Sequence, residues 1–563
     1  MNKYLFIFTI FIFQINAAVI EVNPGQNGAY ITIQDGIDAA AHMDTVLVHD
    51  GVYSGEGNRN LAWNGNSKHI TLMSVNGPES TIIDAQGWNG GEDSQPGRRV
   101  FVFDQSGQDS NDIISGFTIQ NGYLDNSTTE GSNDWLNGAG IYINNADPTF
   151  KNCIIRDNSN RRNCHNCSVR GSGIAAYNSN SIFENCQILD NLTRSEVNHD
   201  NYDAWAYGGG AYIQDGTVTF TRCLFSGNES YTYDHNPSGA SVGYALGGGI
   251  YHYGGTLNLI DTEISNNKLD GYHNSGRDGG GLFNDQGTIN ITNCTIAEND
   301  YQGIYRSGGT VNVSSSIIWY NDSDDSGDIN YSYTNRQGTA PGGDGNISYY
   351  PWFVDIENDD YRLSPGSVCI NRGDPALDDD EDSTRRDMGA YIYEHGHLGP
   401  EWYVSPAGSF ESGNGSIGNP LSSVLAAVNL ANEGDVITLA EGTYTGTGNY
   451  DIYFLGKNVT IQSEGSAENT IIDAEGRNDN GDAQYARRVF SFEPHGDYGS
   501  VSSETIIDDI TISNGYLDAS NSSVYGSGDN LNGSGIYINN SDPTFTNCII
   551  RDNMNRRNCH NCS

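Results

Sequence analysis

The most regular feature of the chain is a pattern of apolar and polar positions that returns six times between Gly138 and Asn321. A small residue marks the same point of each pass, namely Cys153, Cys186, Cys223, Thr262, Cys294 and Ser316. Apolar residues stand twelve and three positions before this anchor and two positions after it. An asparagine stands five positions after it. The residues three before are Phe150, Phe183, Phe220, Leu259, Ile291 and Val313, and the asparagines are Asn158, Asn191, Asn228, Asn267, Asn299 and Asn321. No apolar column breaks register.

Short segments that alternate apolar and polar residues between Gly and Asn predict strands rather than helices, as in Val218–Phe220 and Ile289–Ile291. A repeat at fixed offsets is typical of a solenoid. The last two passes are 22 residues apart, from Leu282 to Ile304, a length that suits one coil of three short strands. The fold class predicted is all-β: a right-handed parallel β-helix solenoid with a short N-terminal capping helix, tandemly duplicated.

In such a coil, equal positions of successive passes stack about 4.8 Å apart. The apolar columns then fill the interior, where each large side chain contributes roughly 1.5–3 kcal/mol by burial. The asparagine column is expected to form a hydrogen-bonded ladder at one corner, at about 1 kcal/mol for each bond. Ile33–Ala41 has apolar residues at helical spacing and is expected to cap the open end of the first coil.

Four of the five spacings between passes are longer than 22 residues, at 33, 37, 39 and 32. All of the excess follows the ladder asparagine and precedes the next Gly-rich strand. The insertions are Ser159–Arg170, Leu192–Tyr207, Glu229–Leu246 and Lys268–Asp278, and an earlier one is Tyr123–Asn137. We therefore expect a set of stacked loops on one edge of the solenoid.

The chain repeats itself from Glu401 onward. Gly533–Ser563 matches Gly138–Ser168 at 27 of 31 positions, with an offset of 395. The predicted organisation is a signal peptide over 1–18, a first β-helix unit over 19–394, a linker over 395–400 and a second unit over 401–563 that is cut short. Within the first unit, the regular coils span 138–321 and a closing segment spans 349–394.

Met1–Ala18 carries a lysine, an apolar run and small residues at its end, which is the pattern of a secretory signal. We therefore expect an exported protein, located outside the cell or on its surface. The net charge of −44 would repel nucleic acids and anionic membranes, so neither is an expected partner. The same charge disfavours uronic or sulfated polysaccharides unless divalent cations bridge them.

The anchor column accepts Thr and Ser as well as Cys, so its cysteines are expected to be small buried residues. Only Cys164 and Cys167 form a separate pair. Their spacing is compatible with a local disulfide or with a metal site, although only His165 stands nearby as a further ligand.

The GGGIY strands, the hydrophobic-x-x-Asn corners and the helical cap resemble right-handed β-helix proteins of the pectate-lyase-like superfamily. The repeats are most similar to bacterial surface proteins such as the polymorphic outer-membrane proteins. Those proteins favour an FxxN pattern, which Phe225–Asn228 of this chain fits, whereas most of its coils have Ile in place of Phe. Tyr349–Glu394 resembles the closing segment of exported proteins of the choice-of-anchor Q type. These resemblances imply fold and export. They do not imply one activity, because the fold carries lyases, hydrolases, adhesins and inert stalks alike.

Each of the four insertions contains one histidine among aromatic and acidic residues. If the loops stack like their coils, these side chains form a row suited to sugar rings. The predicted binding residues are Trp205, Tyr207, Tyr233, His199, His235 and His273. Loops that merely pack on one another are the alternative. Histidines beside carboxylates could also hold a metal if the loops fixed the ligand geometry.

No cofactor is firmly indicated, and Ca²⁺ is possible. Asp378, Asp380 and Asp382 alternate as in a calcium loop, but Ser383 and Gly389 stand where that motif has Gly and Glu, so an ordinary solvated acidic turn is expected. Arg156 and Asp157 are expected to be an outward-facing charged pair.

The catalytic signatures of lyases and hydrolases of this superfamily are not recognisable, so no catalytic residue is predicted. The expected function is a secreted or cell-surface scaffold that binds a polysaccharide or cell-surface glycan through the loop edge. The alternatives are a polysaccharide lyase or glycoside hydrolase, and a passive spacer.

Overall fold

The computed structural model describes residues 17–25, 29–87, 97–125, 136–163, 167–197, 203–234, 242–271, 276–323, 325–410, 412–477, 487–494, 498–518 and 532–556. The chain folds into two compact units. The first comprises Met1–Asn258, Ser265–Thr288 and Ser307–Gly309, and the second comprises Leu259–Ile264, Ile289–Arg306 and Thr310–Ser563. Strands β24 (Ile250–Ile260), β25 (Glu263–Ser265) and β29 (Thr288–Thr292) carry residues of both units.

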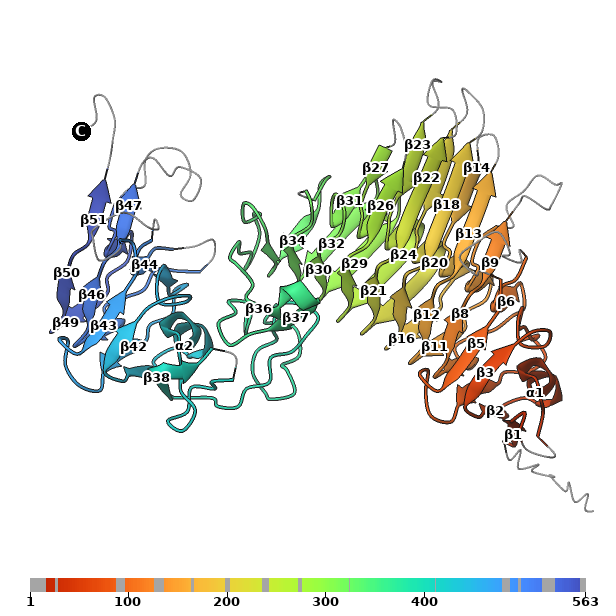
Figure 1. Ribbon diagram of the computed structural model, residues 1–563, viewed down its shortest axis with the longest axis horizontal. Coiled ribbons are helices and arrows are strands. Elements are labelled where there is room, and N and C mark those ends of the chain that lie inside the picture. Colours follow the sequence, from red (N-terminus) through yellow and green to blue (C-terminus); the bar gives the residue numbers. More distant parts are fainter. Residues whose placement is uncertain are drawn as a thin grey trace, which may run out of the picture. The chain divides into compact units, whose positions relative to one another are not determined.

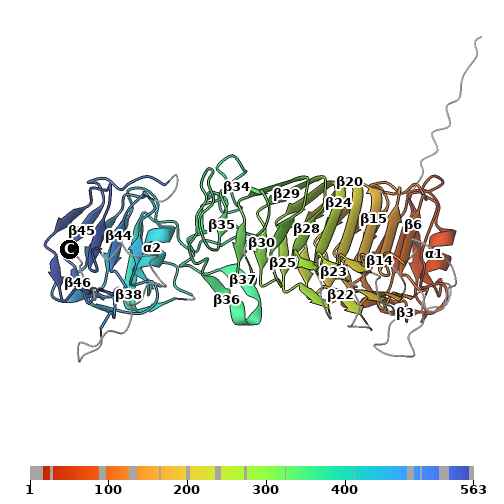
Figure 2. The same ribbon diagram turned by 90° about the horizontal axis from the view of Figure 1, so that it is seen from above.

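The first unit is a parallel β-helix whose coils contribute strands to three faces (Figures 1 and 2). One face holds β1 (Val19–Val22), β2 (Thr45–Val48), β4 (Thr71–Ser74), β7 (Ile113–Ser115), β11 (Thr149–Lys151), β16 (Ile182–Glu184) and the second half of β20 (Ala211–Thr221). The next holds β3 (Gly51–Ser54), β5 (Thr81–Asp84), β8 (Thr118–Gln120), β12 (Ile154–Arg156), β17 (Gln187–Leu189) and β21 (Leu224–Ser226). The third, the tyrosine face, holds β6 (Phe101–Asp104), β10 (Ile141–Asn144), β15 (Ile174–Ser179), the first halves of β20 and β24, and β28 (Leu282–Asn284). The predicted fold class is confirmed.

The interior columns follow the sequence register. Phe150 pairs with Phe183, and Phe183 pairs with Phe220, in parallel register. Their ring centroids lie 5.1 and 4.8 Å apart. In the second unit Leu259, Ile291 and Val313 are fully buried in the same way. The equal offsets in the sequence therefore predicted the core stack correctly in each unit.

The corner asparagines form the predicted ladder. In the first unit Asn158, Asn191 and Asn228 each donate from Nδ2 to Oδ1 of the next asparagine, at 2.9–3.0 Å. Each Nδ2 also donates to a backbone carbonyl of the preceding coil, as from Asn228 to Ile188 at 2.8 Å. The ladder residues are fully buried, so these bonds satisfy amides that water cannot reach.

Cys153, Cys186 and Cys223 are buried thiols, as expected for the anchor column. Arg156 and Asp157 form a partly exposed pair at 3.7 Å, which also agrees with the sequence.

Helix α1 (Ile33–Ala39) caps the first coil (Figure 1). The Thr32 side chain accepts the N–H of Asp35 and so satisfies one amide of the first turn. Ile33 and Ile37 are buried, whereas Asp35 and Asp38 are exposed. At the other end, Lys68 Nζ donates to the carbonyls of Ile37 and Ala40.

The last regular coils lie in the second unit, where the core column changes character. They comprise β30 (Thr295–Ala297), β31 (Ile304–Arg306), β32 (Thr310–Ser314), β33 (Ile317–Trp319), β34 (Asn330–Ser332) and β35 (Asn335–Arg336). Val313 pairs with Tyr331, and Ile318 pairs with Arg336, so polar side chains replace the apolar columns. Residues 322–349 therefore contribute an irregular final coil. The closing segment follows with β36 (Phe353–Asp355), the 3₁₀ helix η2 (Ile356–Asn358) and β37 (Asp360–Leu363).

The duplicated sequence builds the same arrangement again within the second unit. One face holds β38 (Glu401–Ser409), β39 (Val436–Leu439), β42 (Thr460–Ser463), β45 (Ile506–Asp508) and β49 (Thr544–Thr546). A second holds β40 (Gly442–Tyr444), β43 (Thr470–Asp473), β46 (Thr511–Ser513) and β50 (Ile549–Arg551). A third holds β41 (Ile452–Tyr453), β44 (Phe490–Phe492) and β48 (Ile536–Ile538), and β47 (Tyr516–Asp518) pairs with β51 (Met554–Arg556).

The cap of this second copy, α2 (Val424–Leu430), differs from α1 in being buried along its whole length. The closing segment of the first copy covers it: Asn429 Nδ2 donates to the Gly366 carbonyl at 2.9 Å, and Tyr349 lies 4.1 Å from Tyr453 between ring centroids. A cap with protein on both sides needs apolar residues all round, which explains the sequence VLAAVNL.

Candidate functional site

The insertions of the first unit are strand pairs that form two further sheets, and not the loops expected from the sequence. The outgoing strands are β9 (Tyr123–Asp125), β13 (Ser159–Asn163), β18 (Leu192–Val197), β22 (Glu229–Asp234) and β26 (Lys268–Gly271). The return strands are β14 (Cys167–Arg170), β19 (Ala204–Tyr207), β23 (Gly243–Leu246) and β27 (Gly276–Asp278). Both sheets are parallel and project on the same side (Figure 1). We call this pair of sheets the wing.

Small side chains lie between the two sheets of the wing. Val169, Ala206 and Ala245 are fully buried in adjacent return strands, and Ser195 and Ser230 are buried in the outgoing ones. Small residues let the two sheets approach, and Ser230 Oγ bridges them by donating to the Leu246 carbonyl at 3.4 Å. The larger aromatic residues of these strands therefore face outward.

The outer face of the return sheet is aromatic. Trp205 and Tyr244 are neighbours in register, and their rings stack with centroids 6.2 Å apart and planes 7° apart. Tyr207 lies two residues further, with its ring centroid 4.6 Å from that of Tyr251 on the tyrosine face. Burial raises the pKa of Tyr207 to about 12, so its hydroxyl stays neutral and can donate a hydrogen bond.

The outer face of the outgoing sheet combines tyrosines with arginines. Tyr231 and Tyr233 stack with centroids 6.4 Å apart. Arg194 lies over the Tyr231 ring at 4.9 Å. Arg161 and Arg194 both contact the fully buried carboxylate of Glu196, at 2.8 and 2.5 Å. This face therefore offers aromatic surface beside two arginines that share a single carboxylate.

The tyrosine face carries an aromatic row that sequence reasoning missed. The rings of Tyr142, Tyr177, Tyr212, Tyr251 and Phe283 follow one another with centroid distances of 5.9, 5.5, 5.5 and 5.0 Å. Tyr142 and Tyr212 both pair with Ala175, a small residue beside which the Tyr177 ring fits. The sequence signal was available, because an aromatic residue directly follows the apolar one in GAGIY, GGGAY, GGGIY and GGGLF.

Of the predicted binding residues, the structure brings Trp205 and Tyr207 onto the outer face of the return sheet and Tyr233 onto that of the outgoing sheet. His199, His235 and His273 lie outside the described residues, as do Cys164 and His165. The proposed histidine row and the Cys164–Cys167 pair therefore stay predictions.

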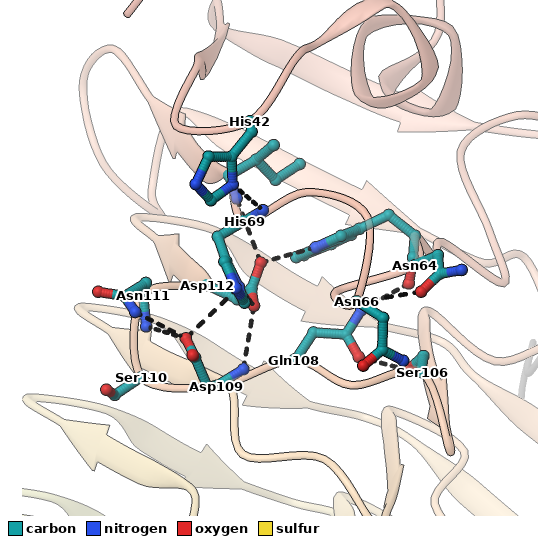
Figure 3. Close-up of polar contacts among 12 residues, drawn as sticks. His42, Asn64, Asn66, His69, Ser106, Gln108, Asp109, Ser110, Asn111 and Asp112 are labelled. Atoms are coloured by element: carbon teal, nitrogen blue, oxygen red, sulfur yellow. Dashed lines mark hydrogen bonds and ion pairs between the residues drawn. The ribbon is translucent and has the colours of Figure 1, made fainter. Parts of the chain in front are cut away.

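One group of described residues has the composition of a metal site: His69, Asp109 and Asp112 lie with ligand atoms within 4.8 Å of one another (Figure 3). His69 Nδ1 is 2.7 Å from Asp112 Oδ2, and this hydrogen bond raises the pKa of His69. Asp112 is fully buried and also accepts from Trp63 Nε1 at 2.8 Å, from the N–H of Ile70 and from the N–H of Asp109. Four donors occupy its two oxygens, which leaves it no lone pair for a metal.

The second copy makes the same connection without any metal ligand. Thr71 and Thr460 start equivalent strands, as do Ile113 and Ile506, so Asn458, Ser502 and Thr505 replace His69, Asp109 and Asp112. Asn458 Oδ1 accepts from Ser502 N at 2.7 Å and from Thr505 Oγ1 at 2.9 Å. In both copies the cluster ties one turn to the start of a strand, and we interpret it as a structural lock.

The acidic turn of the closing segment differs from its prediction. Asp380 is buried rather than solvated, and its Oδ2 accepts the N–H of Asp387 at 3.0 Å. Asp382 Oδ1 accepts from the N–H and hydroxyl of Thr384. These oxygens bond the segment's own backbone and hydroxyl groups, which does not fit a Ca²⁺ loop.

No protein-family model matches this chain, and no curated protein matches it. Solved structures that resemble the chain at low identity include two polysaccharide lyases. Pectate lyase Pel9A is 15% identical with a TM-score of 0.39, over 68% of this chain and 98% of that chain. The PL6 family alginate lyase AlyGC is 12% identical with a TM-score of 0.21, over 95% of this chain and 76% of that chain, and a mutant of it gives a TM-score of 0.23. TM-scores and identities this low carry no conclusion about the activity or substrate of this chain. Neither described helix is long and apolar enough to cross a bilayer.

Proposed function

We propose that this chain is a secreted or cell-surface β-helix scaffold that binds glycans through the wing. The single observation that carries the proposal is the aromatic outer surface of the return sheet, where Trp205 and Tyr244 stack in register. Flat aromatic rings pack against the apolar faces of sugar rings, and neighbouring polar groups bond the hydroxyls.

The wing supports recognition for mechanical reasons as well. Its strands are paired coil by coil, so the aromatic rings stand on paired sheets and lose little freedom on binding. Trp205 and Tyr244 belong to successive coils, so the aromatic surface of the return sheet runs along the solenoid axis, whereas Tyr212 and Tyr251 of the tyrosine face are buried. An extended chain lying along this axis could contact several coils at once.

The test is retention of the full chain on immobilised neutral polysaccharides (cellulose, xylan and mannan) and uronic ones (pectate and alginate), with and without calcium. Trp205→Ala should weaken binding roughly tenfold or more, because it removes contact area worth about 1.5–3 kcal/mol. Tyr350→Ala is the control, because Tyr350 is 45% exposed and belongs to the second unit, whereas the wing belongs to the first.

The enzymatic alternative is followed in the same experiment. Unsaturated products absorbing in the ultraviolet would establish a lyase, and new reducing ends would establish a hydrolase. Retention that Trp205→Ala leaves unchanged would overturn the assignment to the wing, and absence of retention on every glycan would favour the spacer.

A further inference from the structure

The asparagine ladder follows one hydrogen-bonding pattern, and this pattern shows which donor groups its last residue presents. In four steps, from Asn158 through Asn267 and again from Asn299 to Asn321, Oδ1 of one ladder asparagine accepts two hydrogen bonds from the previous one. Asn321 Oδ1 thus accepts the backbone N–H of Asn299 at 3.1 Å and its Nδ2 at 3.0 Å. The same two bonds join Asn158 to Asn191 in the first unit. Every ladder residue therefore presents a backbone N–H and an Nδ2 hydrogen along the stack.

The ladder ends at Asn321. Ile318 pairs with Arg336 in the next coil, so the next ladder position is Thr339, which is exposed because the chain turns away. Asn321 Nδ2 still donates back to the Ile296 carbonyl at 3.0 Å. Among the described residues, no acceptor meets the backbone N–H of Asn321. Within the described part of the chain, no group takes the position of the next carboxamide oxygen.

A cavity of about 200 Å³ lies here, lined by Asn321 together with Ile318, Trp319, Asp322, Ser323 and Gln337. Gln337 Oε1 accepts the N–H of Tyr320 at 2.7 Å, so its carbonyl is already used. The wall therefore combines an amide donor, two apolar side chains and exposed polar groups at the rim. We call it the ladder-end pocket.

Charge decides which acceptor fits. Arg336 is 3.5 Å from Asp325 Oδ2, and Asp325 is also held by the N–H of Ile304 and the hydroxyl of Tyr331, each at 3.0 Å. The guanidinium is thereby neutralised, and Asp322 adds a negative charge at the rim. An anionic acceptor is disfavoured, whereas a neutral amide carbonyl would repeat the chemistry of the ladder itself.

We propose that the ladder-end pocket binds the acetamido group of an N-acetylated sugar. The amide oxygen would accept the N–H of Asn321, and the methyl group would contact Ile318 and Trp319. The ring hydroxyls would bond Asp322 and Ser323. This is a second glycan site, which rests on the same general function but is separate in the chain from the wing.

The test compares chitotriose, which carries acetamido groups, with cellotriose, which lacks them, on the full chain. Calorimetry should give an affinity for chitotriose at least about tenfold higher, as expected for a buried hydrogen bond and a buried methyl group. Saturation-transfer NMR should show the strongest transfer at the acetamido methyl. Ser323→Trp fills the pocket and should abolish this preference, whereas Asp328→Trp, at a fully exposed position, should not.

Equal affinity for the two sugars, or an unchanged preference in Ser323→Trp, would overturn the proposal. Preference for an asparagine-containing peptide over chitotriose would overturn the sugar assignment. Trp205→Ala distinguishes the two sites. If they are separate, Trp205→Ala loses polysaccharide retention and keeps chitotriose binding, whereas Ser323→Trp loses the preference for chitotriose and keeps polysaccharide retention.

Discussion

Asn191 donates twice to the same atom of Asn228: its backbone N–H lies 3.2 Å and its Nδ2 2.9 Å from Asn228 Oδ1. One side-chain oxygen thus closes the corner of the preceding coil and joins two coils together. Both residues are fully buried. The corner depends on a carboxamide, because a buried donor without an acceptor destabilises the fold by its full desolvation free energy.

Asn191→Ala should lower the free energy of unfolding by on the order of 1–3 kcal/mol, because it leaves the Asn158 amide groups without their acceptor. The measurement is urea unfolding followed by circular dichroism. Gln187→Ala, an exposed change on the same coil, is the control and should cost nearly nothing. Equal midpoints for the two variants would contradict the ladder.

The closing segment should loosen as pH rises. Asp387 accepts the N–H groups of Asn371 and Tyr393, and burial raises its pKa to about 7, while burial raises that of Asp380 to about 6. Both values lie above the ordinary aspartate pKa of about 4, so the folded state binds protons more tightly. The stability gained is present below pH ~4 and is lost as pH rises through ~6–7.

Hydrogen exchange at the amides of Asn371 and Tyr393, corrected for intrinsic rates, measures this effect between pH 5 and pH 8. Protection should fall with rising pH in the wild type and change much less in Asp387→Asn. Protection that increases over this interval would contradict the sign of the prediction.

Glu196→Gln should make the outgoing face of the wing more cationic, since Arg161 and Arg194 lose their shared carboxylate. We expect stronger retention on pectate and alginate at low salt, weakening as ionic strength approaches ~1 M. Column retention at stepped salt is the measurement.

The control for that substitution is Glu184→Gln, which releases Lys151 and Arg222 away from the wing. The same gain in both variants would indicate a change of bulk charge rather than a property of the wing. Some destabilisation of Glu196→Gln, of order 1–3 kcal/mol, is expected because the site is buried.

Replacing the His69, Asp109 and Asp112 cluster with the residues of the second copy tests its structural role. The triple variant His69→Asn, Asp109→Ser, Asp112→Thr should unfold within roughly 2 kcal/mol of the wild type, given the equivalent bonds around Asn458. Zinc or calcium should shift neither midpoint. A wild-type midpoint that rises with metal while the variant's does not would identify a metal site instead.

The sequence by itself determined the solenoid, its core columns, the ladder and the duplication. The reason is physical: in a parallel stack each position meets its own equivalent one coil away, so a fixed offset in the chain, such as that from Phe150 to Asn158, becomes a fixed place in space. The insertions could be assigned to one edge for the same reason.

Only the tertiary structure decided what depends on contacts between different columns. It placed Trp205 against Tyr244 on the return sheet and packed the Tyr177 ring beside Ala175. It also buried Asp380 in a turn that the sequence predicted to be solvated. It also showed that the ladder stops at Asn321 beside a cavity. These features depend on contacts between side chains of neighbouring strands, or on the point where the chain leaves the regular coil. A periodic sequence pattern specifies neither.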